Sequence, residues 1–300
     1  MSRRRDRAAV RQSVVCRVIS YGKNSRVRVA RFRVLVAVVL VGALGSGCAG
    51  SGVPRPEGNA TTWSRERFLR AHPPTGTPTA EPASFGKRVG ALFSHDTKGD
   101  HFCTASAVDS PNRNLIITAA HCVHAGRAGG YLSSLVFVPG YRNGNAPYGI
   151  WKVKAQFVDD RWAGDSDPDL DVGFAVLEPR DGKNIEDVLG SNLLGINQGF
   201  GNIVRVTGYP TSSGEPVTCI NKTTQELKYQ MRFACDGYPP GTSGSPWLTH
   251  YDPKTKRGEV IGVIGGYQTG GDEDAVSYSA YFDDDIRKLY ERAIGQGVAN

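Results

Sequence analysis

Residues 241–246, Gly-Thr-Ser-Gly-Ser-Pro, place a serine between two closely spaced glycines. Glycine permits positive φ and close approach of neighbouring backbone, so Ser243 can stand exposed on a tight turn. Backbone N–H groups then lie beside its hydroxyl, as a nucleophile and an oxyanion hole require. Clusters of Gly, Ser and Pro are more often plain turns, so Ser243 carries chemistry only with partners elsewhere in the chain.

A histidine suited to be one partner follows an apolar run. Residues 115–118, Leu-Ile-Ile-Thr, predict a buried strand, and two alanines separate this strand from His121. These small residues would let the imidazole sit at a packed corner and still face a cleft. Because the ordinary pKa of histidine lies near neutral pH, His121 is suited to general-base work. A surface or hydrogen-bonded core histidine is the alternative.

An aspartate stands where another buried strand is predicted to begin. Asp171 directly precedes Val-Gly-Phe-Ala-Val-Leu at 172–177. A carboxylate buried there is costly without a partner. A histidine N–H is such a partner, since the carboxylate fixes the tautomer and stabilises the imidazolium. We choose Asp171 over Asp169 because it abuts the apolar run; a solvated charge at a strand edge is the alternative for either.

Together these blocks resemble the three catalytic blocks of the trypsin/chymotrypsin-like serine peptidase superfamily. They are Thr-Ala-Ala-His-Cys at 118–122, Asp-Val-Gly-Phe-Ala-Val-Leu at 171–177 and Gly-Thr-Ser-Gly-Ser-Pro at 241–246, in the order His, Asp, Ser. The serine block is most similar to the bacterial secreted branch, the glutamyl-endopeptidase-like members. The resemblance covers about residues 89–294.

The resemblance implies a role for each residue. Ser243 would be the nucleophile, His121 the general base and Asp171 the group that orients His121. The N–H groups of Gly241 and Ser243 would form the oxyanion hole, and Ser245 would lie on the loop behind. The implied reaction is hydrolysis of peptide bonds through an acyl-enzyme, for which no metal or cofactor is expected.

The implied fold class is all-β, with two six-stranded antiparallel β-barrels, the site in the cleft between them and a short C-terminal α-helix. From residue 89 the sequence does read as short strands divided by turn clusters. Three aspartates at 283–285 then precede apolar residues at helical spacing. We therefore assign 89–190 to the first barrel and 191–300 to the second barrel plus the helix.

One position departs from the family pattern. Thr242 stands where trypsin-like zymogens have an aspartate that pairs with the N-terminus freed by activation. Activation through that ion pair is therefore not expected. The dibasic pair Lys87-Arg88 need not be cut to form the site.

Four cysteines remain once the two in the first 48 residues are set aside. An even number in an exported chain favours disulfides, with three pairings open. The family pairs the cysteine after the catalytic histidine with one in the preceding strand, which implies Cys103–Cys122 and leaves Cys219–Cys235. The rival is a zinc site from Cys103, Cys122, His121 and His124, disfavoured because His-Cys-Val-His is spaced too tightly.

Substrate preference is open at this point. Pocket walls are expected from about 235–240 and 262–267, where the candidate substrate-binding residues are Asp236, Tyr238, Ile264, Gly265 and Tyr267. Asp236 would attract a basic side chain, and the two tyrosines would line an apolar pocket. Ile264 stands where glutamyl endopeptidases place a histidine for the substrate carboxylate, so glutamate specificity is not expected.

Residues 1–48 have the organisation of an export leader, with arginines up to Arg33, an eleven-residue apolar run at 34–44 and small residues after it. The run is shorter than the roughly 20 residues of a membrane span. Leu44-Gly-Ser-Gly-Cys48 resembles the lipobox of bacterial lipoproteins, with its leucine one residue too early. Lipidation of Cys48 with anchoring outside the membrane, and cleavage near Ala49 with free secretion, are the two alternatives.

The formal net charge of +7 belongs to this leader. It holds eleven of the 36 Lys and Arg residues and one of the 29 acids, which leaves 25 basic and 28 acidic residues. The body is thus near −3, and no nucleic-acid partner is expected. Residues 49–88, rich in Pro, Gly, Thr and Ser, predict a linker or pro-segment. The acids at 165–169 read as a solvated turn, with a calcium site as the weaker alternative.

The sequence therefore predicts a secreted or membrane-anchored serine endopeptidase. We expect a monomer whose partner is a protein or peptide substrate. A non-catalytic binding module on the same fold is one alternative, disfavoured because all three triad residue types are present. A narrowly specific processing peptidase or an esterase would use the same triad, and the sequence does not separate these from a general protease.

Overall fold

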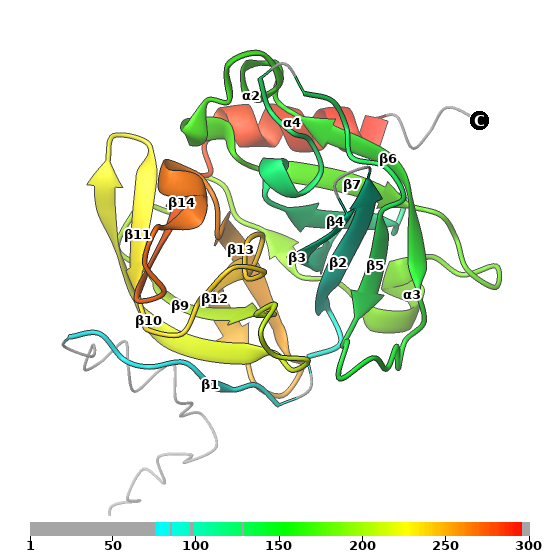
Figure 1. Cartoon of the computed structure of the whole chain (residues 1–300), viewed down its shortest axis with the longest axis horizontal. Helices are drawn as coiled ribbons and strands as arrows, with labels where there is room; N and C mark the ends of the chain where they lie inside the picture. The colour runs from blue at the N-terminus through cyan, green and yellow to red at the C-terminus, as the bar shows by residue number, and fades with distance from the viewer. Residues whose placement is uncertain (1–75, 85, 97–98, 128, 296–300) are drawn as a thin grey trace, which may run out of the picture. The chain divides into compact units, whose positions relative to one another are not determined.

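The computed structural model describes residues 76–84, 86–96, 99–127 and 129–295 (Figure 1). The predicted leader, with Cys48, and the linker up to residue 75 lie outside the described residues. Within the described ranges, no helix has both the length and the apolar character needed to cross a membrane.

Six antiparallel strands form a closed barrel in the first half of the chain, in the order β2-β3-β4-β7-β6-β5. They are β2 (Val89–Asp96), β3 (Gly99–Val108), β4 (Leu115–Thr118), β5 (Val136–Pro139), β6 (Trp151–Val158) and β7 (Gly173–Leu177). Every residue of β4 and β7 is buried, as their apolar runs predict. These two strands pair directly, with Thr118 opposite Gly173.

The second half forms seven strands of an eight-stranded sheet, in the order β14-β11-β10-β9-β12-β13-β8, and the eighth strand, β1, precedes the first barrel in sequence and pairs with β10. The strands are β1 (Glu81–Pro82), β8 (Leu193–Leu194), β9 (Ile203–Gly208), β10 (Val217–Leu227), β11 (Gln230–Ala234), β12 (Pro246–Asp252), β13 (Arg257–Val263) and β14 (Val276–Ala280). The ends of β13 and β14 meet through single hydrogen bonds, from the Val263 N–H to Ser279 Oγ and from the Gly265 N–H to Tyr278 O, both 3.0 Å.

The all-β fold class is confirmed. The second unit, called the second barrel below, is a sheet that is not closed by a continuous strand ladder as the first barrel is, and it differs from the expected six strands in two further details. It carries two strands beyond six, and β8 pairs with β13 in parallel. Both extra strands, β1 and β8, are only two residues long and come from segments that lead into the two barrels. β1 and β8 extend the sheet because their segments lie beside its strands β10 and β13.

Residues 76–83, expected at the end of the linker, are paired with the second barrel. Glu81 lies opposite Thr218 in an antiparallel pair. The Ala80 N–H donates to Asp236 O at 2.7 Å, and the Asp236 N–H donates to Pro78 O at 2.8 Å. This part of the chain is therefore a strap on the sheet.

The helix α4 (Asp284–Gly295) covers the first barrel although it follows the second in sequence. In Figure 1 it runs beside β6 and β7. Its buried residues Ile286, Leu289 and Ala293 belong to the same apolar cluster as the first-barrel core. The Tyr290 ring meets Phe174 edge-on at 5.8 Å. The chain thus returns to the first barrel and ties the two together.

Short helical turns lie between the strands and position the site. They are η2 (Ala120–Cys122), α2 (Asp160–Asp165), η3 (Pro168–Leu170), α3 (Ile185–Leu189) and η4 (Tyr267–Gly270).

Candidate active site

His121 and Asp171 meet at one end of the first barrel. His121 lies in η2 after β4, and Asp171 directly follows η3 and precedes β7. Because β4 and β7 pair, the two residues are neighbours despite 50 residues of separation. Nδ1 of His121 lies 2.8 Å from Oδ2 of Asp171, and the His121 N–H donates to Oδ1 at 3.0 Å. Asp171, rather than Asp169, is the carboxylate that contacts the histidine.

The Asp171 carboxylate is fully buried and accepts a further hydrogen bond from the second barrel. The Gly266 N–H donates to Oδ2 at 2.9 Å. Gly265 needs to be small, since a Cβ there would lie 3.0 Å from Asp171 O and 3.1 Å from Oδ2. Two backbone donors and the imidazole offset the cost of burying this charge.

The environment of His121 favours its protonated form. Burial of the ring opposes protonation, but the Asp171 charge and hydrogen bond outweigh burial, so the pKa of His121 lies above its ordinary value. About a fifth of the His121 side chain is exposed (21 %). The imidazole can therefore take up a proton from a group in the adjoining cavity and hold it against Asp171.

The serine loop, between β11 and β12, is docked on the first barrel. The Thr104 N–H donates to Ser243 O at 2.8 Å, and Thr104 Oγ1 donates to Gly241 O at 3.1 Å. Gly241 and Gly244 have φ of +98° and +82°. A Cβ on Gly244 would lie 2.1 Å from Thr104 O, so only glycine permits this approach.

Three backbone N–H groups of the loop donate hydrogen bonds to acceptors in the loop itself or in the neighbouring segment. Those of Thr242, Gly244 and Ser245 donate to Pro239 O (3.3 Å), Ile264 O (2.7 Å) and Thr242 O (3.0 Å), respectively. Among the described residues, the N–H groups of Gly241 and Ser243 have no acceptor. These are the two groups expected to form the oxyanion hole.

His121, Gly241 and Ser243 line one cavity of about 260 Å³. Within the described ranges the Ser243 hydroxyl makes no hydrogen bond. Ser245 is fully buried and its Oγ donates to Thr242 O at 2.6 Å, so it is not available to a substrate. The cavity thus brings together an open serine, an imidazole backed by a carboxylate, and two open N–H groups.

The solved structures similar to this chain include proteases, whereas no protein-family model and no curated protein matches it. The protease Anisep from Arthrobacter nicotinovorans is 26 % identical, with a TM-score of 0.65 over 72 % of this chain and 100 % of that one. The thermostable serine protease AL20 from an extremophilic microorganism is 26 % identical, with a TM-score of 0.64 over 70 % and 98 %. The chain belongs to the trypsin/chymotrypsin-like superfamily. A Glu endopeptidase, 16 % identical with a TM-score of 0.59 over 74 % and 99 %, shares the fold.

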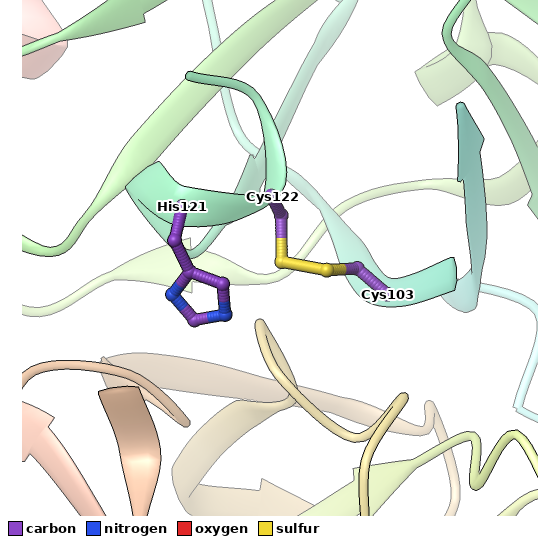
Figure 2. A group of neighbouring side chains, drawn as sticks. All are labelled: Cys103, His121 and Cys122. Atoms are coloured by element: carbon purple, nitrogen blue, oxygen red, sulfur yellow. A yellow bond between two sulfur atoms is a disulfide. The ribbon is translucent and has the colours of Figure 1, made fainter. Parts of the chain in front are cut away.

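Both disulfides expected for this member of the superfamily are present, Cys103–Cys122 and Cys219–Cys235. Figure 2 shows the first of them beside the His121 ring. Its sulfur atoms are bonded to each other, so they are not thiolate ligands, and the zinc alternative is wrong. His124 is also engaged, because its Nδ1 accepts from the Gly126 N–H at 3.0 Å.

The five candidate substrate-binding residues do not line the cavity at Ser243. Tyr238 and Ile264 are buried in the core of the second barrel, and the Tyr238 hydroxyl donates to Val206 O at 2.8 Å. Gly265 packs against Asp171, whereas Asp236 and Tyr267 are exposed. The Tyr238 ring is therefore part of the core rather than of this cavity, and its expected place in an apolar substrate pocket stays a prediction.

Some contributors to this superfamily site were not identified from the sequence. The cavity includes Phe102, Leu132 and Pro240, and it shares Phe102 with a larger neighbouring cavity of about 650 Å³. Gly266 supports Asp171 through its backbone. The adjacent glycines 265 and 266 were the available signal, since paired glycines often mark a close backbone approach.

Proposed function

We propose that this chain is an exported serine endopeptidase that hydrolyses peptide bonds through an acyl-enzyme. The observation that carries the proposal is the shared cavity of Ser243 and His121, with Asp171 behind the imidazole. In this proposal Ser243 is the nucleophile, His121 the general base and Asp171 the residue that orients and stabilises it. The open N–H groups of Gly241 and Ser243 are the oxyanion hole.

In the acylation step, Ser243 Oγ attacks the carbonyl carbon of the scissile peptide bond. Its proton passes to Nε2 of His121, because Nδ1 is held by Asp171. The charge that develops on the carbonyl oxygen is met by the two N–H groups, of which one alone typically contributes about 10²- to 10³-fold in kcat. The imidazolium then gives its proton to the leaving amine, and the C–N bond breaks.

In the deacylation step, a water molecule takes the place of the amine. His121 removes its proton as it attacks the ester carbonyl, and the same N–H groups stabilise the second oxyanion. The proton returns to Ser243 Oγ as the acid product leaves. No metal or cofactor enters either step.

Protein or peptide substrates are the class that the protease neighbours support. The two disulfides support folding in an oxidising compartment outside the cytoplasm. Together with the predicted leader, the disulfides favour a protein that acts outside the cell, either freely secreted or anchored to the membrane through a lipid on Cys48. We expect it to act as a monomer.

Labelling with a fluorophosphonate probe tests the proposal directly. The purified chain should label, and Ser243→Ala and His121→Ala should abolish labelling. Ser245→Ala is the matched control, because Ser245 is buried behind the loop and should not be the labelled residue. A folded, disulfide-bonded parent that neither labels nor cleaves a peptide library would favour the binding module. A parent that labels but cleaves only esters or a single sequence would favour the narrower enzyme classes.

A further inference from the structure

Gln230, the first residue of β11, has a fully buried side chain that joins two segments of the chain. Its Nε2 donates to Pro168 O at 2.9 Å and to Asp169 Oδ1 at 2.7 Å, both in η3. Its Oε1 accepts from the Tyr267 N–H, the start of η4, at 3.0 Å. The amide thus uses both donors and its carbonyl to tie the first barrel to the second.

The two joined segments are those that hold Asp171. Asp171 is the residue on which η3 ends, two positions after Asp169. Gly266, directly before Tyr267, donates its N–H to Asp171 Oδ2. The fit is close, since a Cβ on Gly266 would lie 2.4 Å from Gln230 Oε1. A shift of either segment would therefore move the carboxylate relative to His121.

We propose that Gln230 is a positioning residue that keeps Asp171 in register with His121, an inference that rests on the proposed function. Gln230 acts through η3 and η4 rather than through the substrate. The competing interpretation is that Gln230 only satisfies buried backbone groups. Asp171 contacts His121 directly, and Asp169, two positions before Asp171, is the carboxylate that Gln230 holds.

Gln230→Met tests this role, because methionine has a similar length and forms none of the three hydrogen bonds. We expect kcat to fall about 10- to 100-fold with KM little changed, since small displacements of catalytic groups have effects of this size. The acid limb of the kcat/KM profile should move to lower pH, because a looser Asp171 stabilises the imidazolium less.

Asn221→Leu is the matched control. Asn221 is buried on the neighbouring strand β10, and its Nδ2 donates to Ala234 O at 2.6 Å. Its partners lie in β10 and β11 rather than in η3 or η4. This variant should lower stability and leave the pH profile in place.

A second pair of variants avoids the core. Asp169→Ala removes one of the two acceptors of the Gln230 amide and leaves Pro168 O, whereas Asp169→Asn keeps a side-chain acceptor and removes only the charge. Both variants lose the Asp169 charge, so any effect of this charge on the pH profile should be equal in the two. A lower kcat in Asp169→Ala than in Asp169→Asn would therefore report the hydrogen bond from Gln230 Nε2 to residue 169. Equal kcat values would contradict the inference, and this comparison decides the matter if Gln230→Met does not fold.

Titration of the His121 imidazole by NMR provides a readout that does not need turnover. A His121 pKa lower in Gln230→Met than in the parent supports the inference. A folded variant with the parent's kcat and the parent's His121 pKa overturns it. A parent that neither labels nor hydrolyses peptides overturns the proposed function instead, and the titration still decides whether Gln230 controls the contact between Asp171 and His121.

Discussion

The Gly266 N–H donates a hydrogen bond of 2.9 Å to Oδ2 of Asp171, so the two barrels meet at the carboxylate behind His121. Asp171 belongs to the first barrel and Gly266 follows β13 of the second. The same oxygen lies 2.8 Å from Nδ1 of His121. The position of the imidazole is thus tied to how the barrels pack, which makes the glycines at 265 and 266 sensitive positions.

Gly265→Ala should lower kcat/KM by about tenfold and stability by about 1–3 kcal/mol, as overpacking typically does. The new methyl group would press on Asp171 O, Asp171 Oδ2 and Ala119 Cβ at 3.0–3.2 Å. Steady-state kinetics and urea unfolding measure the two effects. Gly201→Ala is the control, because its nearest neighbour would be Lys222 Cε at 3.7 Å. Equal behaviour of the two variants would contradict this prediction.

The rate of peptide hydrolysis should rise with pH through the pKa of His121, because only the neutral imidazole accepts the serine proton. This pKa lies above the ordinary histidine value, since the Asp171 charge and hydrogen bond outweigh burial. Asp171→Asn should move the acid limb to lower pH and reduce kcat by about 10⁴, the loss known for this replacement in the general Ser-His-Asp template. An acid limb that stays in place would show that another group controls it.

The contact between His121 and Asp171 should also make the free energy of unfolding depend on pH, and the direction of this dependence follows from the pKa of His121. The pKa of His121 is higher in the folded state than in the unfolded state. The stabilisation that the protonated imidazole contributes is therefore fully present at a pH below its pKa in the unfolded state. It is lost as pH rises through the folded value. Urea unfolding of the parent and of His121→Ala across this range should give curves that converge as pH increases. A difference that grows with pH would contradict the assignment.

The two disulfides should have similar effects on stability and different effects on activity. They span 19 and 16 residues in sequence, so removing either should cost about 3 kcal/mol. Only Cys103–Cys122 adjoins His121 in the cavity at Ser243. We expect replacement of both of its cysteines by alanine to lower the fluorophosphonate labelling rate, whereas the same change at Cys219 and Cys235 should leave it unchanged. Equal labelling rates in the two double variants would argue against a role for the first disulfide in the site.

Thr242 should not tolerate the aspartate found at this position in trypsin-like zymogens. Its side chain is buried, and its Oγ1 donates to Pro239 O at 2.7 Å. Thr242→Asp would bury a charge beside a carbonyl oxygen, whereas Thr242→Val only removes a hydrogen bond worth about 1 kcal/mol. Urea unfolding should therefore show a clearly larger loss for the aspartate. Equal losses would imply that a cation reaches this position.

Local sequence determined the parts of this protein that depend on neighbouring residues. The apolar runs before His121 and after Asp171 specified the two buried strands, and the glycines around Ser243 specified a tight turn. The spacing of Ile286, Leu289 and Tyr290 specified the last helix. Each of these features follows from period, size or permitted φ, which a short stretch of chain expresses by itself.

Tertiary structure alone decided which of these parts meet. Gly266 and Asp171 are 95 residues apart, and Gln230 and Pro168 are 62 apart, so no local pattern relates them. Tyr238 was expected in a pocket because its residue type suits either a pocket wall or a core, and its contact with Val206 placed it in the core. The side on which α4 packs depends on which barrel offers the complementary apolar surface. The sequence of a segment determines which of its side chains can be buried, but only the packed fold determines the segment against which they pack.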